Sequence, residues 1–367
     1  MKRKVLCCIM LSVFMLTGCY DQRNIEDVSL SLVLGIDLDR NNNLLVYMSS
    51  PVFNKEAKVK EEITGVKSVT IRDSRDKFDA TVMAFTSGSK TQVILVGKRL
   101  LKQKKWMKYL DPFYRDPKNT VTTRVVAVDG PISDVIHYSP KDKPRLPLYL
   151  TKLVDTAALR NITVKTTLQE LHEQVADKGL TANITEMKKN NKIFVTGTAL
   201  LDEQGRYKLT LKPDENKLLR ILQQGTTGEF SFTIPIKLKS DSQDKDWISF
   251  TAYSIKAKTK VRYDNKFIFN TDIKMKVGIT EQIFSFNTRK DAAKLQKAIE
   301  TKLEADFKQL IKKIQAANTD PIGFGQYART YTYPEWKKVQ NKWNNALAKG
   351  DVNIKVNVEI GAMGTIK

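Results

Sequence analysis

Apolar and polar positions alternate along most of the last third of the chain. Residues 230–236, 247–263 and 273–279 each place apolar side chains at every second position. A period of two is typical of β-strands that bury one face. Residues 352–360 are the most regular example, with apolar side chains at every even position. These segments predict long strands of the antiparallel type.

A different period separates these strands. Over residues 291–317 the apolar side chains recur at intervals of three and four: Ala292, Leu295, Ile299, Leu303, Phe307, Leu310 and Ile314. This spacing predicts one long amphipathic helix. Its stripe has the ordinary width of a core face, so we expect it to cover the sheet; a helix that binds a partner or a membrane surface is the alternative.

The first half of the chain mixes both periods. Residues 30–36 and 44–48 predict a hairpin, and residues 54–62 are charged and aperiodic, which predicts a loop or linker. A second predicted hairpin, formed by residues 193–201 and 207–211, is assigned to the sheet that begins at Leu30.

Between the hairpins, strands and helices alternate. We predict a strand ending at Ile71, a helix over 74–86, a strand over 92–97, a basic helix over 98–110 and a strand over 120–128. The strand over 92–97 is continuously apolar, which predicts cover on both faces. This order favours a mixed sheet with helices packed on it.

Further along, two helices follow a proline-rich stretch. Thr167 and Glu170 have capping-box spacing at the start of the second one.

Together these patterns predict an α+β protein of several domains, with mixed β-sheets flanked by helices and a C-terminal antiparallel sheet packed by one long helix. We divide the chain into a signal segment (1–18), a discontinuous N-terminal domain (19–65 with 191–212), a middle α/β domain (66–190) and a C-terminal α+β domain (213–367).

The N-terminal segment carries a more specific signal. Basic residues at 2–4 precede an apolar run over 5–16 that is too short to span a bilayer of about 30 Å. The sequence Leu16-Thr17-Gly18-Cys19 then resembles the lipobox of prelipoproteins, in which the cysteine is diacylated and becomes the first mature residue. An ordinary secretory signal is the alternative.

Cysteine content supports the lipoprotein interpretation. Cys7 and Cys8 lie in the segment to be removed, and Cys19 is the only other cysteine. No disulfide can then form within the mature chain, and an acylated thiol serves as an anchor. Cys19 is therefore our candidate lipidation site.

Charge narrows the choice of partners. The formal net charge is +22, and loss of Lys2, Arg3 and Lys4 leaves +19. Export makes nucleic acid an unexpected partner, and no stretch interleaves aromatic residues with lysines as single-strand-binding surfaces do. The basic charge therefore favours an anionic membrane surface or wall polymer as the partner. A solvated exterior that only maintains solubility is the other interpretation.

Residues for catalysis are sparse. The chain has two histidines, His137 and His172, with no acid or nucleophile at a telling interval and no metal-binding motif. Ser87 and Lys90 have the bare SxxK spacing of penicillin-recognising enzymes, but the companion motifs are absent. We expect no catalytic residue, cofactor or metal.

Two nearby glycines bear on the question of a nucleotide cofactor. Gly323 and Gly325 form GxG without a third glycine or a preceding buried strand, so a dinucleotide site is not supported.

Two blocks of the sequence carry a family resemblance. Gly18-Cys19-Tyr20-Asp21-Gln22-Arg23-Asn24-Ile25-Glu26-Asp27, followed by Gly35-Ile36-Asp37, resembles the C subunits of spore germinant receptors, the Ger(x)C lipoproteins of endospore-forming bacteria. A second block continues the resemblance in the same order: Asp320-Pro321-Ile322-Gly323-Phe324-Gly325, Tyr333-Pro334-Glu335-Trp336, Trp343 and the strand from Val352.

The resemblance implies a three-domain, non-enzymatic subunit held by lipid at the outer face of the spore inner membrane. It implies assembly with two integral membrane subunits, A and B, into a receptor for small nutrients that triggers germination. Cys19 is the functional residue that transfers by position.

We expect Pro321, Gly323 and Gly325 to form a turn. Trp336 and Trp343 should lie on one face of a short helix in the core; an exposed pair would instead anchor an interface.

Two other classes stay open. A solute-binding lipoprotein of an importer would share the anchor but would need two similar α/β lobes around a hinge. An envelope hydrolase would share the export signal but lacks the residues.

Overall fold

An eight-stranded mixed sheet forms the larger part of the protein. The computed structural model describes residues 24–139, 141–225, 227–236, 246–283 and 291–362. The spatial order of the strands is β10-β9-β8-β7-β6-β2-β3-β4. Their bounds are β2 (Val33–Leu38), β3 (Leu44–Pro51), β4 (Glu61–Ser68), β6 (Val93–Gly97), β7 (Arg124–Val128), β8 (Asn183–Lys189), β9 (Ile193–Leu201) and β10 (Tyr207–Leu211).

The centre of this sheet is parallel and its two edges are antiparallel. Strands β2, β6, β7 and β8 run parallel to one another. Strands β3 and β4 extend one edge by antiparallel pairing, and β9 and β10 extend the other. A separate parallel pair, β1 (Val28–Leu30) with β5 (Phe85–Ser87), follows the 3₁₀ turn η1 (Ile25–Asp27).

Helices cover both faces of the eight-stranded sheet. The core on one face includes side chains of α2 (Ile71–Asp79), α3 (Lys98–Leu101), η2 (Trp106–Leu110), α4 (Asp111–Arg115) and α7 (Leu168–Ala176). The core on the other face includes side chains of α5 (Ile132–Ile136) and α6 (Leu146–Leu159). All residues of β6 are therefore buried, which confirms the prediction from its continuous apolar run.

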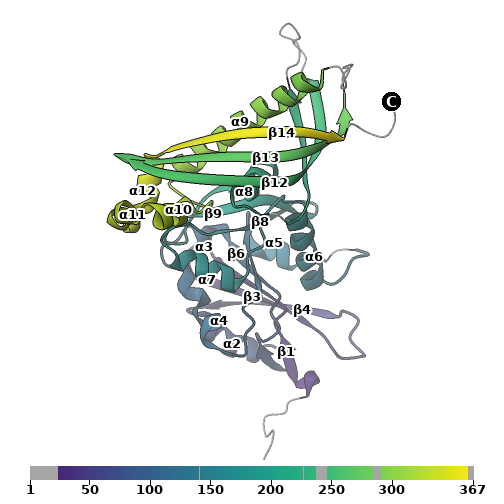
Figure 1. Ribbon diagram of the computed structural model, residues 1–367. Helices are drawn as coiled ribbons and strands as arrows, with labels where there is room; N and C mark the ends of the chain where they lie inside the picture. Colours follow the sequence, from purple (N-terminus) through teal and green to yellow (C-terminus); the bar gives the residue numbers. More distant parts are fainter. Residues whose placement is uncertain (1–23, 140, 226, 237–245, 284–290, 363–367) are drawn as a thin grey trace, which may run out of the picture.

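A four-stranded sheet with one long helix forms the rest (Figure 1). Its strands, in spatial order, are β11 (Phe230–Ile236), β12 (Asp246–Asp264), β13 (Lys266–Gln282) and β14 (Asp351–Ala362). Helix α9 (Ala292–Ala316) buries its stripe in the same core as these strands. Helices α8 (Pro213–Leu222), α10 (Phe324–Tyr331), α11 (Tyr333–Val339) and α12 (Trp343–Ala348), with the turn η3 (Gln340–Lys342), complete this part.

Helix α9 also protects the edge of this sheet. Glu300 and Glu304 accept hydrogen bonds from the backbone N–H groups of Val358 and Val356, both at 3.0 Å. An unpaired edge strand is a template for aggregation, and these carboxylates occupy donors that another chain would otherwise pair with.

The opposite face of the four-stranded sheet is exposed and mostly basic. Directly paired positions place lysines beside one another, as at Lys256 and Lys274. The exposed cations on this open face are Lys256, Lys258, Lys260, Arg262, Lys266, Lys274, Lys276 and Lys355, and the exposed acids are Asp264, Asp272, Glu281 and Glu359. We call this surface the open face.

The prediction of an α+β fold with a C-terminal sheet packed by one long helix is confirmed. One detail differs, because β14 pairs parallel to β13 while the other pairs are antiparallel. A parallel neighbour needs a crossover connection, and α9 with the short helices after it supplies that crossover.

Local predictions succeed in part. The hairpin over 193–211 and the capping box at Thr167 are confirmed. The helix predicted over 74–86 is wrong at its end, because α2 stops at Asp79 and β5 begins at Phe85. The single helix predicted over 98–110 is also wrong, because the chain breaks after Leu101 and Lys105 takes a positive φ of 64°.

The predicted N-terminal and middle domains share the eight-stranded sheet. Strands β2 and β3 come from the first of these units, β6 to β8 from the second, and β9 and β10 from the first again. The boundaries of the predicted division therefore cut through one continuous sheet, and the division stays a prediction.

Candidate functional site at the junction of the two sheets

Two short segments, 177–181 and 320–329, form part of the junction between the two sheets. Thr181 donates its backbone N–H to the Asp320 carbonyl at 2.8 Å, and the Asp320 N–H returns a bond to the Thr181 hydroxyl at 2.9 Å. Arg329 on α10 binds both carboxylate oxygens of Asp177, at 3.0 and 3.1 Å. Backbone pairing and a bidentate ion pair thus fix the two parts together.

Asp320 organises the turn that precedes α10. Its fully buried carboxylate accepts hydrogen bonds from the backbone N–H groups of Gly323, Phe324 and Gly325 and from the Trp343 indole, at 2.8 to 3.1 Å. Burial raises the pKa of the Asp320 carboxyl, and these donors act in the opposite direction. One side chain therefore ties the turn to α12.

Gly325 is required by the close approach of the two segments. A Cβ at this position would lie 2.6 Å from both the Cα and the carbonyl oxygen of Gly179, and 2.7 Å from the Trp343 Nε1. Real Cβ atoms do not tolerate such contacts, so any larger residue would push the sheets apart.

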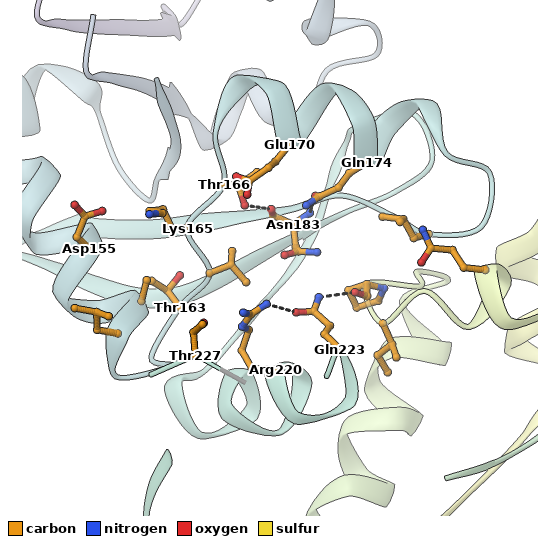
Figure 2. Close-up of a pocket in the computed structure, with 17 residues that line it drawn as sticks. Asp155, Thr163, Lys165, Thr166, Glu170, Gln174, Asn183, Arg220, Gln223 and Thr227 are labelled. Carbon is orange, nitrogen blue, oxygen red and sulfur yellow. Dashed lines mark hydrogen bonds between the residues drawn. The ribbon is translucent and has the colours of Figure 1, made fainter. Parts of the chain in front are cut away.

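A cavity of about 680 Å³ lies beside this junction. Figure 2 shows Arg220 of α8 and Gln223, the residue that follows this helix, on one side, facing Asn183 and Gln174 on the other. Asp155, Lys165 and Glu170 also line it. Concave sites of this size with a few convergent polar groups are typical of small-molecule binding.

Arg220 is the central charge of the cavity. Its Nη1 donates to the Gln223 Oε1 at 2.9 Å, and the Gln223 amide donates to the Pro321 carbonyl at 2.7 Å. Burial lowers the pKa of Arg220 from its ordinary value, and the charge of Glu170 acts in the opposite direction. A guanidinium stays protonated in proteins, so Arg220 places a positive charge in the cavity. Gln223 connects this charged side chain to the turn that Asp320 organises.

The carboxylates that line the cavity are already engaged. Arg124 binds both oxygens of Asp155, at 2.8 and 2.9 Å. Glu170 accepts the Thr167 backbone N–H at 2.8 Å in the capping box at the start of α7. Neither carboxylate forms an ion pair with Arg220 among the described residues. The Arg220 guanidinium can therefore bind an anionic group of a ligand.

The structure does not gather the other sequence candidates at this cavity. His137 stacks edge-on with Tyr47, and His172 packs on Tyr114. Ser87 ends β5 and Lys90 follows in a turn, so the pair does not lie on one helix. Cys19 lies outside the described residues.

The turn and tryptophan predictions have clear outcomes. Pro321 and Gly323 lie in the expected turn after the long helix, with Gly323 at a positive φ of 86°, whereas Gly325 lies in the first turn of α10. Trp336 and Trp343 are in the core, at 3% and 2% exposure, as predicted. They lie on separate helices, α11 and α12, so the single helix expected for them is wrong.

Sequence reasoning missed the two elements that carry Arg220 and Asn183. Helix α8 had a usable signal, because Pro213 stands at its first turn with Asp214 and Glu215 beside it. Strand β8 had a weaker signal in the sequence. Its residues Thr185 and Glu186 are polar, although the structure buries both of them.

Comparison with known proteins gives a family for the chain. A family model described as "Spore germination protein N-terminal domain" matches residues 21–189. A second, "Spore germination B3/ GerAC like, C-terminal", matches residues 196–364. The two matches together span most of the sequence.

Individual relatives agree over nearly full length. Spore germination protein B3 of Bacillus subtilis (strain 168) is 25% identical and covers 96% of this chain and 95% of its own. Spore germination protein KC of the same organism is 24% identical, and the match covers 94% of this chain and 92% of that protein.

The fold agrees with a solved structure as well. The crystal structure of the GerBC protein matches with a TM-score of 0.58 at 20% identity, covering 92% of this chain and all of that one. The chain belongs to the GerAC-like family of spore germination proteins, as a subunit of the C type.

Proposed function

We propose that this chain is a lipid-anchored, non-enzymatic subunit of a nutrient germinant receptor, acting with integral membrane subunits A and B at the outer face of the spore inner membrane. The observation that carries the proposal is Leu16-Thr17-Gly18-Cys19, which directly precedes a sequence matched along its length by spore germination proteins. Two acyl chains on Cys19 would give stable anchoring, since each buried methylene contributes about 0.8 kcal/mol.

Two structural features are compatible with an anchored role. Among the described helices, none has the length and apolar character needed to cross a bilayer. The open face offers a mostly basic surface, and basic residues near an anionic bilayer contribute about 1 kcal/mol each. Together they support attachment by acylation with an electrostatic contribution.

The importer alternative fits the fold less well. A solute-binding lipoprotein would need two similar α/β lobes, whereas the described residues form an eight-stranded sheet and a four-stranded sheet of different connectivity. The scattered positions of His137, His172 and Ser87 support a non-enzymatic subunit.

The anchor is tested with Cys19→Ala, and Cys8→Ala is the matched control because Cys8 lies in the segment to be removed. We expect Cys19→Ala to abolish incorporation of labelled palmitate, release the protein from spore membranes and weaken germination. Cys8→Ala should match the wild type. Unchanged membrane retention and germination in Cys19→Ala would refute the anchor.

The partners are tested by affinity isolation of the tagged full chain from detergent-solubilised spore membranes. We expect two multi-span proteins to co-purify. Loss of vegetative solute uptake on gene deletion, with normal germination, would instead favour the importer class.

A further inference from the structure

Arg220 stands out because its charge has no carboxylate partner among the described residues. The only hydrogen bond of the Arg220 side chain to a described residue is the one from Nη1 to Gln223. A guanidinium has five N–H donors, so most of them are left for a ligand or for water. The side chain is half-buried, and an incompletely paired charge at such a position is costly.

The guanidinium is held in place before any ligand arrives. Gln223 links it to the Pro321 carbonyl of the Asp320 turn. On its other side, a Cβ at Gly225 would lie 2.6 Å from the Arg220 Nη2, so the backbone lies against the planar group. A preorganised fork of donors is suited to an oxyanion, because little entropy is lost on binding.

The rest of the cavity adds polar and apolar surface of complementary kinds. The Asn183 carboxamide faces Arg220 across the space (Figure 2) and has no hydrogen bond to another described side chain. Leu159, Leu180 and Ile322 form an apolar part of the lining. Leu159 is 63% exposed, so apolar surface there is available to a ligand.

We propose that this cavity binds a small organic carboxylate, with the Arg220 guanidinium on the carboxylate group and Leu159, Leu180 and Ile322 against the hydrocarbon part. Asp155 and Glu170 each bind another group, and Glu170 acts on Arg220 through its charge without forming an ion pair with it among the described residues. This binding function goes beyond membrane attachment and does not depend on acylation of Cys19.

The test is titration calorimetry on the full chain in detergent, with acetate, hexanoate and inorganic phosphate as probes. We expect saturable binding of hexanoate. Its four additional methylenes should make it bind about tenfold or more tightly than acetate. Phosphate has no apolar part and should bind more weakly than hexanoate.

Arg220→Gln should weaken hexanoate binding by about tenfold or more, since a charge-assisted hydrogen bond is lost. Arg262→Gln, which removes the same charge from the open face, is the matched control and should leave the affinity within about twofold. Asn183→Asp is a second probe, because a negative charge facing Arg220 would compete with the ligand. Thermal unfolding without ligand identifies any variant that is not folded.

Three results would overturn the proposal. They are absence of saturable hexanoate binding to the wild type, phosphate binding tighter than hexanoate, or equal affinity in folded Arg220→Gln and wild type. If Arg220→Gln does not fold, unchanged affinity in folded Asn183→Asp would overturn it in the same way.

Discussion

The two sheets of this protein differ in how many of their faces are covered by helices. In the eight-stranded sheet, helices lie on both faces and the central strand β6 is buried throughout. In the four-stranded sheet, α9 covers one face and the open face carries lysines in water. The first sheet therefore depends on packing on two sides, and the second combines a one-sided core with a charged surface.

This difference explains why the two regions have different sequence patterns. A strand buried on both faces has no reason to alternate, so β6 reads as an apolar run. A strand with one face in water must alternate, and β14 does so with apolar residues at its even positions. The comparison leads to five predictions, ordered by their expected effect on stability.

Leu95→Ala should have the largest effect. Leu95 in β6 is fully buried, and its truncation leaves a cavity that costs about 2–5 kcal/mol. Lys274→Ala on the open face should change the free energy of unfolding by less than about 0.5 kcal/mol. Guanidinium unfolding followed by circular dichroism measures both; equal losses would contradict the contrast between the sheets.

Asp320→Asn should weaken the junction. The amide keeps the shape, but it places an NH₂ group against donors that now bond to a carboxylate oxygen. Leaving buried donors unsatisfied costs about 1–3 kcal/mol. Tryptophan fluorescence during unfolding measures the loss. Asp214→Asn, which removes an exposed charge paired with Lys217, is the control and should shift the unfolding midpoint much less.

Thr167→Ala should cost about 1 kcal/mol, because it removes the side-chain acceptor from the capping box at the start of α7. Thr301→Ala is the matched control: its exposed hydroxyl bonds back to the Lys297 carbonyl within α9 and caps nothing. A thermal midpoint lowered as much by Thr301→Ala would argue against the cap.

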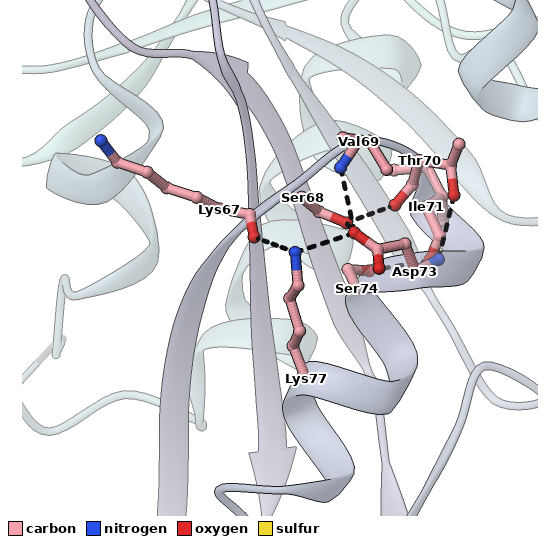
Figure 3. A network of polar contacts seen from close by, with 8 residues as sticks. All are labelled: Lys67, Ser68, Val69, Thr70, Ile71, Asp73, Ser74 and Lys77. Atoms are coloured by element: carbon pink, nitrogen blue, oxygen red, sulfur yellow. Dashed lines mark hydrogen bonds and ion pairs between the residues drawn. The ribbon is translucent and has the colours of Figure 1, made fainter.

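We expect Asp73, beside the edge strand β4 of the eight-stranded sheet, to make stability depend slightly on pH. Hydrogen bonds from Lys77, Ser68 and the Val69 N–H lower the pKa of its carboxyl below the ordinary value (Figure 3). Stability from this group is therefore present above an unfolded pKa of about 3.9 and is lost as pH falls through the lower folded value.

Asp73→Asn tests this dependence. The variant should be less stable than the wild type near neutral pH, and the gap should close in strong acid. Unfolding midpoints across an acid series measure it, with exposed Asp76→Asn as the control. A gap that is constant over the whole series would show that ionisation of Asp73 contributes nothing.

The open face should give the smallest change in stability. Replacing Lys256, Lys258 and Lys260 by glutamine should leave the unfolding free energy within about 0.5 kcal/mol. Binding to anionic vesicles should weaken by about 1 kcal/mol per lysine at low salt if this face contributes to membrane attachment. Co-sedimentation measures that loss, and unchanged binding would leave the lysines a role in solubility alone.

Much of the fold could be predicted because periodicity reports burial. The long helix, the hairpin over 193–211 and the strands over 230–282 follow from local patterns alone. The parallel pairing of β14 could not be predicted, because strand direction depends on where the crossover helices pack. The break after Leu101 depends on a backbone turn at Lys105 that its sequence neighbours do not signal.

The cavity was less accessible to sequence reasoning than the fold. Arg220, Asn183 and Pro321 come from three separate elements, and only tertiary packing brings them together. The block that begins at Asp320 was identified as a turn, but its role at the junction depends on Thr181 and Gly179, which lie far away in the sequence.

The late position of β14 in the chain has a consequence for folding. Until β14 has been synthesised, β13 is left with an unpaired side, because its partner follows α9 and three short helices in the chain. Pairing between segments so distant in sequence is slow to form. The four-stranded sheet can therefore be completed only after β14, the last described strand, has been synthesised and has paired with a strand made much earlier.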